Sequence, residues 1–150
     1  MSRSISPATD RRFNLLVGAV TVHDGMLLLL RRSERESFLP KAWGIPAGQV
    51  HFKEDPVEAS LRELFEETGL RGQVINLIGY SRFQSEQNCV QLDNVQLNFL
   101  VSTPGCDIKL DPFSHSDFRW ISLDDLGSDL LDDFTRGIAE SARTYYKEGR

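Results

Sequence analysis

The segment between Asp55 and Gly69 carries signals for a helix at both of its ends. Asp55 is a favourable N-cap residue, and Pro56 suits the first helical position, where a backbone N–H has no intrahelical partner. Gly69 suits the left-handed position that follows a helix C-terminus. A helix bounded this clearly buries one face, and the expected buried stripe consists of Val57, Leu61, Leu64 and Thr68.

Three glutamates occupy the side of this helix that points away from the apolar stripe. Glu63, Glu66 and Glu67 stand at positions i, i+3 and i+4, so their carboxylates crowd together and repel one another. No Lys or Arg follows them until Arg71. Two interpretations fit this pattern. The face is either a solvated charged surface or a hard-cation site, because Mg²⁺ in proteins takes carboxylates together with substrate phosphates.

Stretches rich in β-forming residues lie on both sides of the helix. Phe13–Val22 and Met26–Arg31 flank the pair Asp24-Gly25, a pattern that predicts a β-hairpin. Residues 33–41 are expected to form a loop. The remaining expected elements are strands at 43–48, 74–81, 90–102 and 118–122, and a helix over 123–146 with a break near Gly127. This order predicts an α/β protein in which helices cover the faces of a mixed sheet.

Length and charge narrow the class of protein. The 150 residues suit one domain, expected over 11–150 after a flexible tail at 1–10. The net charge of −5 disfavours a nucleic-acid coat or a membrane surface as partner, but not a small polyanion. The polar start resembles no signal peptide, and Leu27–Leu30 is too short to cross a bilayer. Cys89 and Cys106 are expected as reduced thiols in a cytoplasmic protein.

The segment Gly48–Leu70 resembles the Nudix box, whose pattern is G-x5-E-x7-R-E-U-x-E-E-x-G-U with U a bulky aliphatic residue. Every fixed position of the pattern is matched. The resemblance extends more weakly to Leu28–Arg32, to Trp43-Gly44-Ile45-Pro46 and to Arg119-Trp120-Ile121-Ser122. It implies the Nudix fold, an α/β/α sandwich with a central mixed β-sheet.

The resemblance also implies roles for particular residues. Glu66 and Glu67 correspond to a metal-binding pair, and Glu63 to a residue that binds metal or activates water, which makes it the first candidate for the base. Arg62 corresponds to an arginine that orients these glutamates. The backbone carbonyl of Ala47 corresponds to a metal ligand. Mg²⁺ is the implied cofactor, with Mn²⁺ able to substitute.

Two positions depart from the family pattern. Most members have Pro-Gly-Gly where this chain has Pro46-Ala47-Gly48; alanine still offers a carbonyl, and Gly48 still lets the chain pass close. Some members add a carboxylate from a loop before the later tryptophan. Here the acidic residues of loop 111–117 are shifted from that offset, so the sequence does not decide whether one joins the site. The histidines His23, His51 and His115 form no metal pattern and are expected at the surface or behind the site.

The implied reaction is hydrolysis of a nucleoside diphosphate linked to another group. A nucleoside triphosphate cleaved to monophosphate and pyrophosphate is the first choice, and a nucleotide-sugar of the ADP-ribose type is the second. A Nudix-like module that binds nucleotides without cutting them is the alternative from another class. The expected partner is a small nucleotide, and a homodimer remains open. Candidate substrate-binding residues are Arg31, Arg32, Gly48 and Phe83, although the arginines also suit a solvated strand end and Phe83 a core position.

Overall fold

Nine elements follow one another along residues 10–148, the part of the chain that the computed structural model describes. They are β1 (Asp10–His23), β2 (Met26–Arg32), β3 (Trp43–Gly44), β4 (Ala47–Gln49), α1 (Pro56–Thr68), β5 (Gln73–Gln87), β6 (Val90–Ser102), β7 (His115–Ser122) and α2 (Asp133–Lys147). The expected tail lies outside the described residues, apart from Asp10, which opens β1. Neither helix has the length and apolar character needed to span a membrane.

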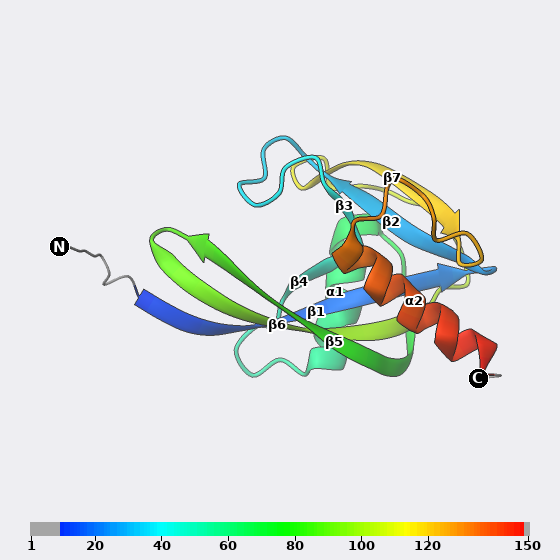
Figure 1. Cartoon of the computed structure of the whole chain (residues 1–150), viewed down its shortest axis with the longest axis horizontal. Helices are drawn as coiled ribbons and strands as arrows, with labels where there is room; N and C mark the ends of the chain where they lie inside the picture. Colours follow the sequence, from blue (N-terminus) through cyan, green and yellow to red (C-terminus); the bar gives the residue numbers. More distant parts are fainter. Residues whose placement is uncertain (1–9, 149–150) are drawn as a thin grey trace.

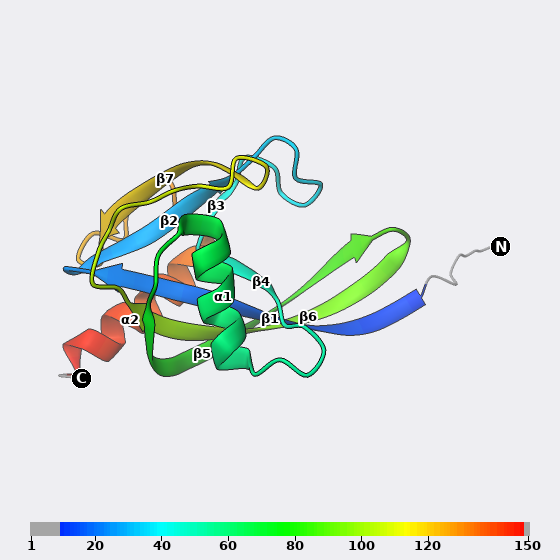
Figure 2. The same ribbon diagram turned by 180° about the vertical axis from the view of Figure 1, so that it is seen from behind.

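The strands form one mixed sheet in the order β3-β2-β1-β6-β5, with β4 paired to β1 and β7 paired to β2. Strands β1 and β6 run parallel, whereas the other pairs are antiparallel. Helix α1 lies on one face of the sheet and α2 on the other (Figures 1 and 2). The expected α/β/α sandwich around a mixed sheet is therefore confirmed.

The run Leu27–Leu30 on β2 shows why the sheet needs a helix on each face. All four leucines are at most 1% exposed. Leu27 and Leu29 belong to the core beneath α2, and Leu28 and Leu30 to the core beneath α1. A strand that is buried on both faces reads as a continuous apolar run, because successive side chains point to opposite sides.

The hairpin predicted around Asp24-Gly25 is present. Asp24 and Gly25 both have positive φ, 49° and 75°, as a tight two-residue hairpin turn requires. The single short strand expected at 43–48 is divided into β3 and β4, with Ile45 and Pro46 between them. The backbone carbonyl of Pro46 accepts the N–H of Ala19 at 2.8 Å, which places β4 against the centre of β1.

Strands β5 and β6 form a hairpin that is longer than the sequence suggested. β5 continues past Ser81 to Gln87 and turns through Asn88 and Cys89, both with positive φ. Beyond the helices, the end of this hairpin and the start of β1 extend together as an arm (Figures 1 and 2). We use "arm" below for residues 10–15, 80–87 and 90–95. Cys89 at its tip and Cys106 are both free and exposed.

The helix expected from Leu123 begins only at Asp133, so that boundary was wrong. The carboxylate of Asp132 caps α2 by accepting the N–H of Thr135 at 2.7 Å. Arg136 donates to the carbonyls of Leu126, Ser128 and Leu131 at 2.9, 3.2 and 2.9 Å. Since Arg136 binds these carbonyls, the preceding segment is held as a loop. The leucines of this loop are buried in the core beneath α2. Their spacing resembles that of a buried helix face, which is why the sequence predicted a helix here.

Candidate active site

The cap residues fix where α1 begins and ends. The carboxylate of Asp55 accepts the N–H of Val57 at 2.8 Å. Gly69 has a φ of 76° and its N–H donates to the carbonyl of Phe65 at 2.8 Å. Both predicted helix boundaries are therefore confirmed. Within these limits the helix presents its glutamates toward the chain that leaves β4.

Arg62 is the centre of the polar network on α1. Its Nε and Nη2 donate to the two carboxylate oxygens of Glu54 at 2.7 and 2.9 Å. Its Nη1 donates to Glu63 and Glu66 at 3.0 and 3.1 Å, and Nη2 also reaches the carbonyl of Gln49 at 2.9 Å. A planar guanidinium suits such a fork because its N–H groups have fixed directions. The side chain therefore ties the helix to the loop before it.

The same network sets the charge state of Glu54. Hydrogen bonds from the Arg62 side chain and, second, from the backbone N–H of His51 lower the pKa of Glu54 to about 2. The pKa of Arg62 is raised, chiefly by its hydrogen bond to Glu54. Both groups are thus charged throughout the neutral range. Glu54 therefore acts as an anchor for Arg62.

Glu63 and Glu67 converge beside Gly48. A Cβ added to Gly48 would stand 2.1 Å from the carboxylate carbon of Glu63, so only glycine leaves room for this side chain. Glu67 is 7% exposed. Burial, followed by the hydrogen bond with Glu63 and its charge, raises the pKa of Glu67 well above the ordinary value. The backbone N–H of Ala47 and the charge of Arg32 act in the opposite direction.

The buried position of Glu67 corrects one expectation from the helical wheel. The acidic side of α1 is not uniformly exposed, because Glu67 lies under β4 while the side chain of Glu66 remains 56% exposed. The wheel could not show that β4 passes over this part of the acidic face. The three glutamates therefore have three different environments: buried, partly covered and solvated.

His115 is the residue of this region that the sequence did not identify. It is 7% exposed, and its Nε2 lies 3.7 Å from Oε1 of Glu67. Burial, and then the charge of Arg32, lower the pKa of His115 to about 4, so the imidazole is neutral at neutral pH. Among the buried side-chain atoms of residues 10–148, Glu67 Oε1 and His115 Nδ1 have no hydrogen-bond partner. Unsatisfied buried polar atoms on two neighbouring side chains need an explanation, and a bound ion or ligand is one that fits this place.

The acidic residues of loop 111–117 do not reach this place. The carboxylate of Asp111 accepts the backbone N–H of Phe113 at 3.1 Å, and that of Asp117 accepts the N–H of Phe118 at 2.7 Å. Both bonds are exposed. His115 occupies the position beside Glu67 instead. The sequence signal for it was the departure of this loop from the family offset.

A cavity of about 280 Å³ opens beside Gly48, Glu67 and His115. Phe83 reaches it from the arm and stacks on Phe38 with ring centroids 5.9 Å apart. Phe134, at the start of α2, meets Phe83 edge-on at 5.5 Å. Three elements that are distant in sequence thus place aromatic rings at one side of the cavity.

The floor of the cavity is made of amide side chains on the sheet. Asn94 and Gln96 on β6 are 1% and 4% exposed. Asn14 donates to the side-chain carbonyl of Asn94 at 2.8 Å, and Asn94 donates to the hydroxyl of Ser85 at 2.9 Å. Gln96 donates to the side-chain carbonyl of Asn98 at 2.9 Å. These bonds fix the orientation of the amides that face the cavity.

The two neighbouring arginines of β2 point to different sides. Arg32 lines the cavity, where its Nε donates to the carbonyl of Phe38 at 2.7 Å. Arg31 lies at a separate hollow with Glu34, Lys41 and other residues of the adjoining loops. Strand alternation separates the pair. The structure therefore brings Arg32, Gly48 and Phe83 together at the cavity and leaves Arg31 outside it.

The residues present fit a divalent cation in part. Two carboxylates in one partly buried place, one with an orphaned oxygen, are a costly arrangement that a cation would relieve. Within residues 10–148, however, no group of three or more His, Cys, Asp or Glu side chains is gathered closely enough to hold a metal ion. Arg62 binds the carboxylates of both Glu63 and Glu66, and the side chain of Glu66 is 56% exposed.

Comparison with known proteins gives a consistent result. A family model described as the NUDIX domain matches residues 12–145. An RNA pyrophosphohydrolase of Xylella fastidiosa is 32% identical over 124 residues, which cover 71% of this chain and 63% of that protein. The chain thus spans less than two thirds of the length of each of the curated relatives that it matches.

Solved structures show the same likeness over nearly the whole chain. The MutT protein of Methanosarcina mazei Go1 has a TM-score of 0.72 and 26% identity, covering 97% of this chain and 99% of that one. A MutT NUDIX hydrolase of Burkholderia pseudomallei has a TM-score of 0.72 and 27% identity, covering 87% and 98%. Together with the complete box on α1, these matches show that the chain belongs to the Nudix family of hydrolases.

Proposed function

We propose that the chain hydrolyses a phosphoanhydride bond in a nucleoside diphosphate linked to another group, with Mg²⁺ as its cation and Mn²⁺ as a substitute. One observation carries the proposal: Glu63 and Glu67 converge beside Gly48 at a cavity that aromatic rings flank on another side. The carboxylates suit the phosphate end of a nucleotide through a cation, and the rings suit its base.

Glu63, Glu66 and Glu67, with the backbone carbonyl of Ala47, are the residues that we assign to the cation. When bound, the cation would neutralise phosphate charge and make a water molecule more acidic. Glu63 is our candidate for the base, since it lies beside Gly48 of the cavity and is held by Arg62 at 3.0 Å. Arg62 positions the glutamates, and Arg32 is placed to pair with a phosphate oxygen.

The reaction that we assign begins with attack of water on a phosphorus atom. The proton of that water passes to the carboxylate, the bond to the bridging oxygen breaks, and the leaving phosphate departs with the electron pair. From a nucleoside triphosphate the products are a monophosphate and pyrophosphate.

The cavity supports recognition of a base by stacking. Phe38, Phe83 and Phe134 offer ring faces and edges, and the amides of Asn94 and Gln96 lie across the floor from them. Stacking of a base on an aromatic side chain contributes about 1–3 kcal/mol, largely independent of the base. Oriented amides add selectivity, because an amide bonds a base edge by both donor and acceptor.

The substrate that we favour is a nucleoside triphosphate, with a nucleotide-sugar of the ADP-ribose type as runner-up. The 5′ end of an RNA is a further candidate, because a relative with 32% identity is named RNA pyrophosphohydrolase. The net charge of −5 favours small substrates over a long polyanion. A module that binds without cutting is disfavoured, because every box glutamate is retained.

The test is a product analysis with three substrate classes. The protein is incubated with Mg²⁺ and a nucleoside triphosphate, ADP-ribose or a 5′-triphosphorylated RNA, and the products are separated. A monophosphate with pyrophosphate from the first substrate supports the proposal. Release of inorganic phosphate alone would assign a different bond. Binding of a nucleotide in the presence of Mg²⁺, without formation of any product, would favour the module that binds without cutting.

A further inference from the structure

The outer edge of β5 in the arm is a regular strand edge with no partner strand among residues 10–148. β5 is the last strand in the sheet order, so one of its edges faces away from β6. Irregularities interrupt its pairing between Val74 and Asn76 and between Leu77 and Gly79, whereas pairing from Gly79 to Gln87 is continuous. Natural proteins protect such edges with proline, bulges or charged side chains, lysine above all. Residues 79–87 contain no proline, lysine or bulge, and their charged residues are Arg82 and Glu86.

The turn at the tip shows which backbone groups point outward. Gln87 and Val90 flank a two-residue turn, so they form a hydrogen-bonded pair. Bonded and non-bonded pairs alternate along an antiparallel ladder. The backbone N–H and C=O groups of the alternate residues, Tyr80, Arg82, Gln84 and Glu86, therefore point to the free edge. The backbone bonds outside the regular ladders of residues 10–148 include none from these four residues.

The charges on this edge are complementary to the same edge turned by a two-fold axis. Arg82, Gln84 and Glu86 share one face of β5 because side chains alternate along a strand. If the axis passes through Gln84, the two copies of Gln84 face each other, and each Arg82 faces a Glu86. An axis through Arg82 or through Glu86 would instead oppose like charges, which destabilises a sheet. Only one of these registers thus combines outward backbone groups with opposite charges.

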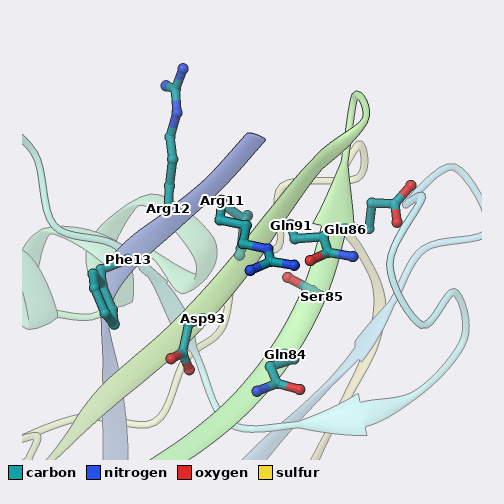
Figure 3. A pocket seen from close by; sticks show the side chains of 9 residues that line it. Arg11, Arg12, Phe13, Gln84, Ser85, Glu86, Gln91 and Asp93 are labelled. Atoms are coloured by element: carbon teal, nitrogen blue, oxygen red, sulfur yellow. The ribbon is translucent and has the colours of Figure 1, made fainter. Parts of the chain in front are cut away.

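Each of the two charged side chains keeps a group that can pair across this register. Arg82 bonds Asp93 of the neighbouring strand β6 through Nε at 3.1 Å and through Nη2, so its guanidinium reaches across the sheet and only Nη1 is free of that pair. Glu86 has no ion pair among the described residues. In Figure 3, which shows the hollow on this face of the arm, Glu86 points away from Arg11 and outward beyond β5.

We infer that the β5 edge of the arm, residues 80–87, is an interface for a second copy of this chain. The two edges pair antiparallel about a two-fold axis through Gln84. Arg82 of each copy then lies between its own Asp93 and Glu86 of the partner. Three facing pairs exchange backbone hydrogen bonds, and the sheets of the two copies become continuous. This inference is independent of the proposed hydrolysis.

Charge reversal provides the test. Glu86→Arg alone places arginine opposite Arg82 of the second copy, and Arg82→Glu alone places glutamate opposite Glu86. Each variant alone should be monomeric by sedimentation velocity at concentrations where the wild type is a dimer. A mixture of the two should form a heterodimer, because every facing pair is then of opposite charge. Asp107→Arg, an equal charge reversal at an exposed position away from the arm, should leave the dimer unchanged.

Hydrogen exchange locates the contact independently of charge. The amides of residues 80–87 should exchange more slowly as the wild-type concentration rises, and those of the Glu86→Arg variant should not respond. Far-ultraviolet circular dichroism and melting curves verify that both variants fold. A wild type that is monomeric at high micromolar concentration overturns the inference. So does a dimer that persists in both variants, or a mixture of them that fails to associate.

Discussion

At the scale of single residues, Gly48 shows how closely the backbone approaches the carboxylates. A methyl group at this position would overlap the carboxylate of Glu63. Gly48→Ala should therefore displace Glu63, lower the stability by about 1–3 kcal/mol and lower turnover by about 100-fold. Melting curves and steady-state kinetics check both effects.

The matched control is Gly137→Ala in α2, where an added Cβ meets no atom within 4 Å. It should keep wild-type turnover and gain about 0.5–1 kcal/mol from the better helix propensity. If Gly48→Ala behaved like this control, the close approach of Gly48 and Glu63 would have no functional importance.

His115 should make the protein sensitive to acid. Its folded pKa, lowered to about 4 by burial and by Arg32, lies below the ordinary value of 6.5. The unfolded chain therefore binds the proton more readily, and stability is lost as the pH falls from 6.5 through about 4. His115→Gln should reduce this loss by on the order of 2 kcal/mol.

The measurement is denaturant unfolding at several pH values in EDTA. Glu67 acts in the opposite sense: its raised pKa stabilises the protein at low pH, and this contribution is lost as the pH rises. Comparing His115→Gln with wild type in a Glu67→Gln background separates the two groups. An identical acid dependence in both proteins would show that His115 does not titrate as its environment implies.

At the scale of elements, β5 carries residues of opposite roles on its two faces. Phe83 faces the cavity, whereas Tyr80 is 72% exposed on the other face. Phe83→Ala should raise KM for the nucleotide by roughly 10-fold with little change in kcat, because stacking is lost equally in the ground and transition states. Tyr80→Ala should leave both constants unchanged. An unaltered KM in the Phe83 variant would place the base elsewhere.

The elements differ in how well the sequence predicts them, and the reasons are local. The limits of α1 follow from Asp55 and Gly69, whose capping bonds join residues no more than four positions apart along the chain. The limits of β6 were also predicted correctly. The start of α2 was wrong, because Arg136 binds loop carbonyls up to ten residues earlier. The length of β5 was missed, because its last residues are held by β6 rather than by an apolar pattern of their own.

Some residues of the candidate site could also be predicted from the sequence, and others could not. Arg62, Glu63 and Glu67 share one helix, so their grouping follows from the spacing of the box. His115 and Phe134 reach the cavity from β7 and from the start of α2, which only the folded sheet brings near Glu67 and Phe83. Alternation along a strand also separates Arg31 from Arg32, and a pair of adjacent arginines gives no sign of which one faces the cavity.

At the scale of the whole molecule, the fold buries a carboxylate, that of Glu67, between α1 and the sheet, and this burial costs free energy of folding. Burying Glu67 beside Glu63 opposes folding when both are charged, and the pKa of Glu67 is raised for the same two reasons, burial and the neighbouring carboxylate. Arg62 offsets part of it by holding Glu63 and Glu66. The cation that we propose would offset the rest by binding the folded state. The stability of the apo protein and its affinity for metal should therefore be linked.

Glu67→Gln tests this linkage because it keeps the size of the side chain and removes one charge. In EDTA near pH 8 the variant should be at least as stable as wild type, since it buries no charge beside Glu63. Wild type should gain stability on addition of Mg²⁺, by about 2.7 kcal/mol at a concentration 100 times the dissociation constant, and the variant should gain much less. Turnover should fall by roughly 100-fold or more. Melting curves with and without Mg²⁺, recorded alongside product formation, give both quantities. A variant that keeps wild-type turnover and the full response to Mg²⁺ would return these glutamates to the role of surface charges.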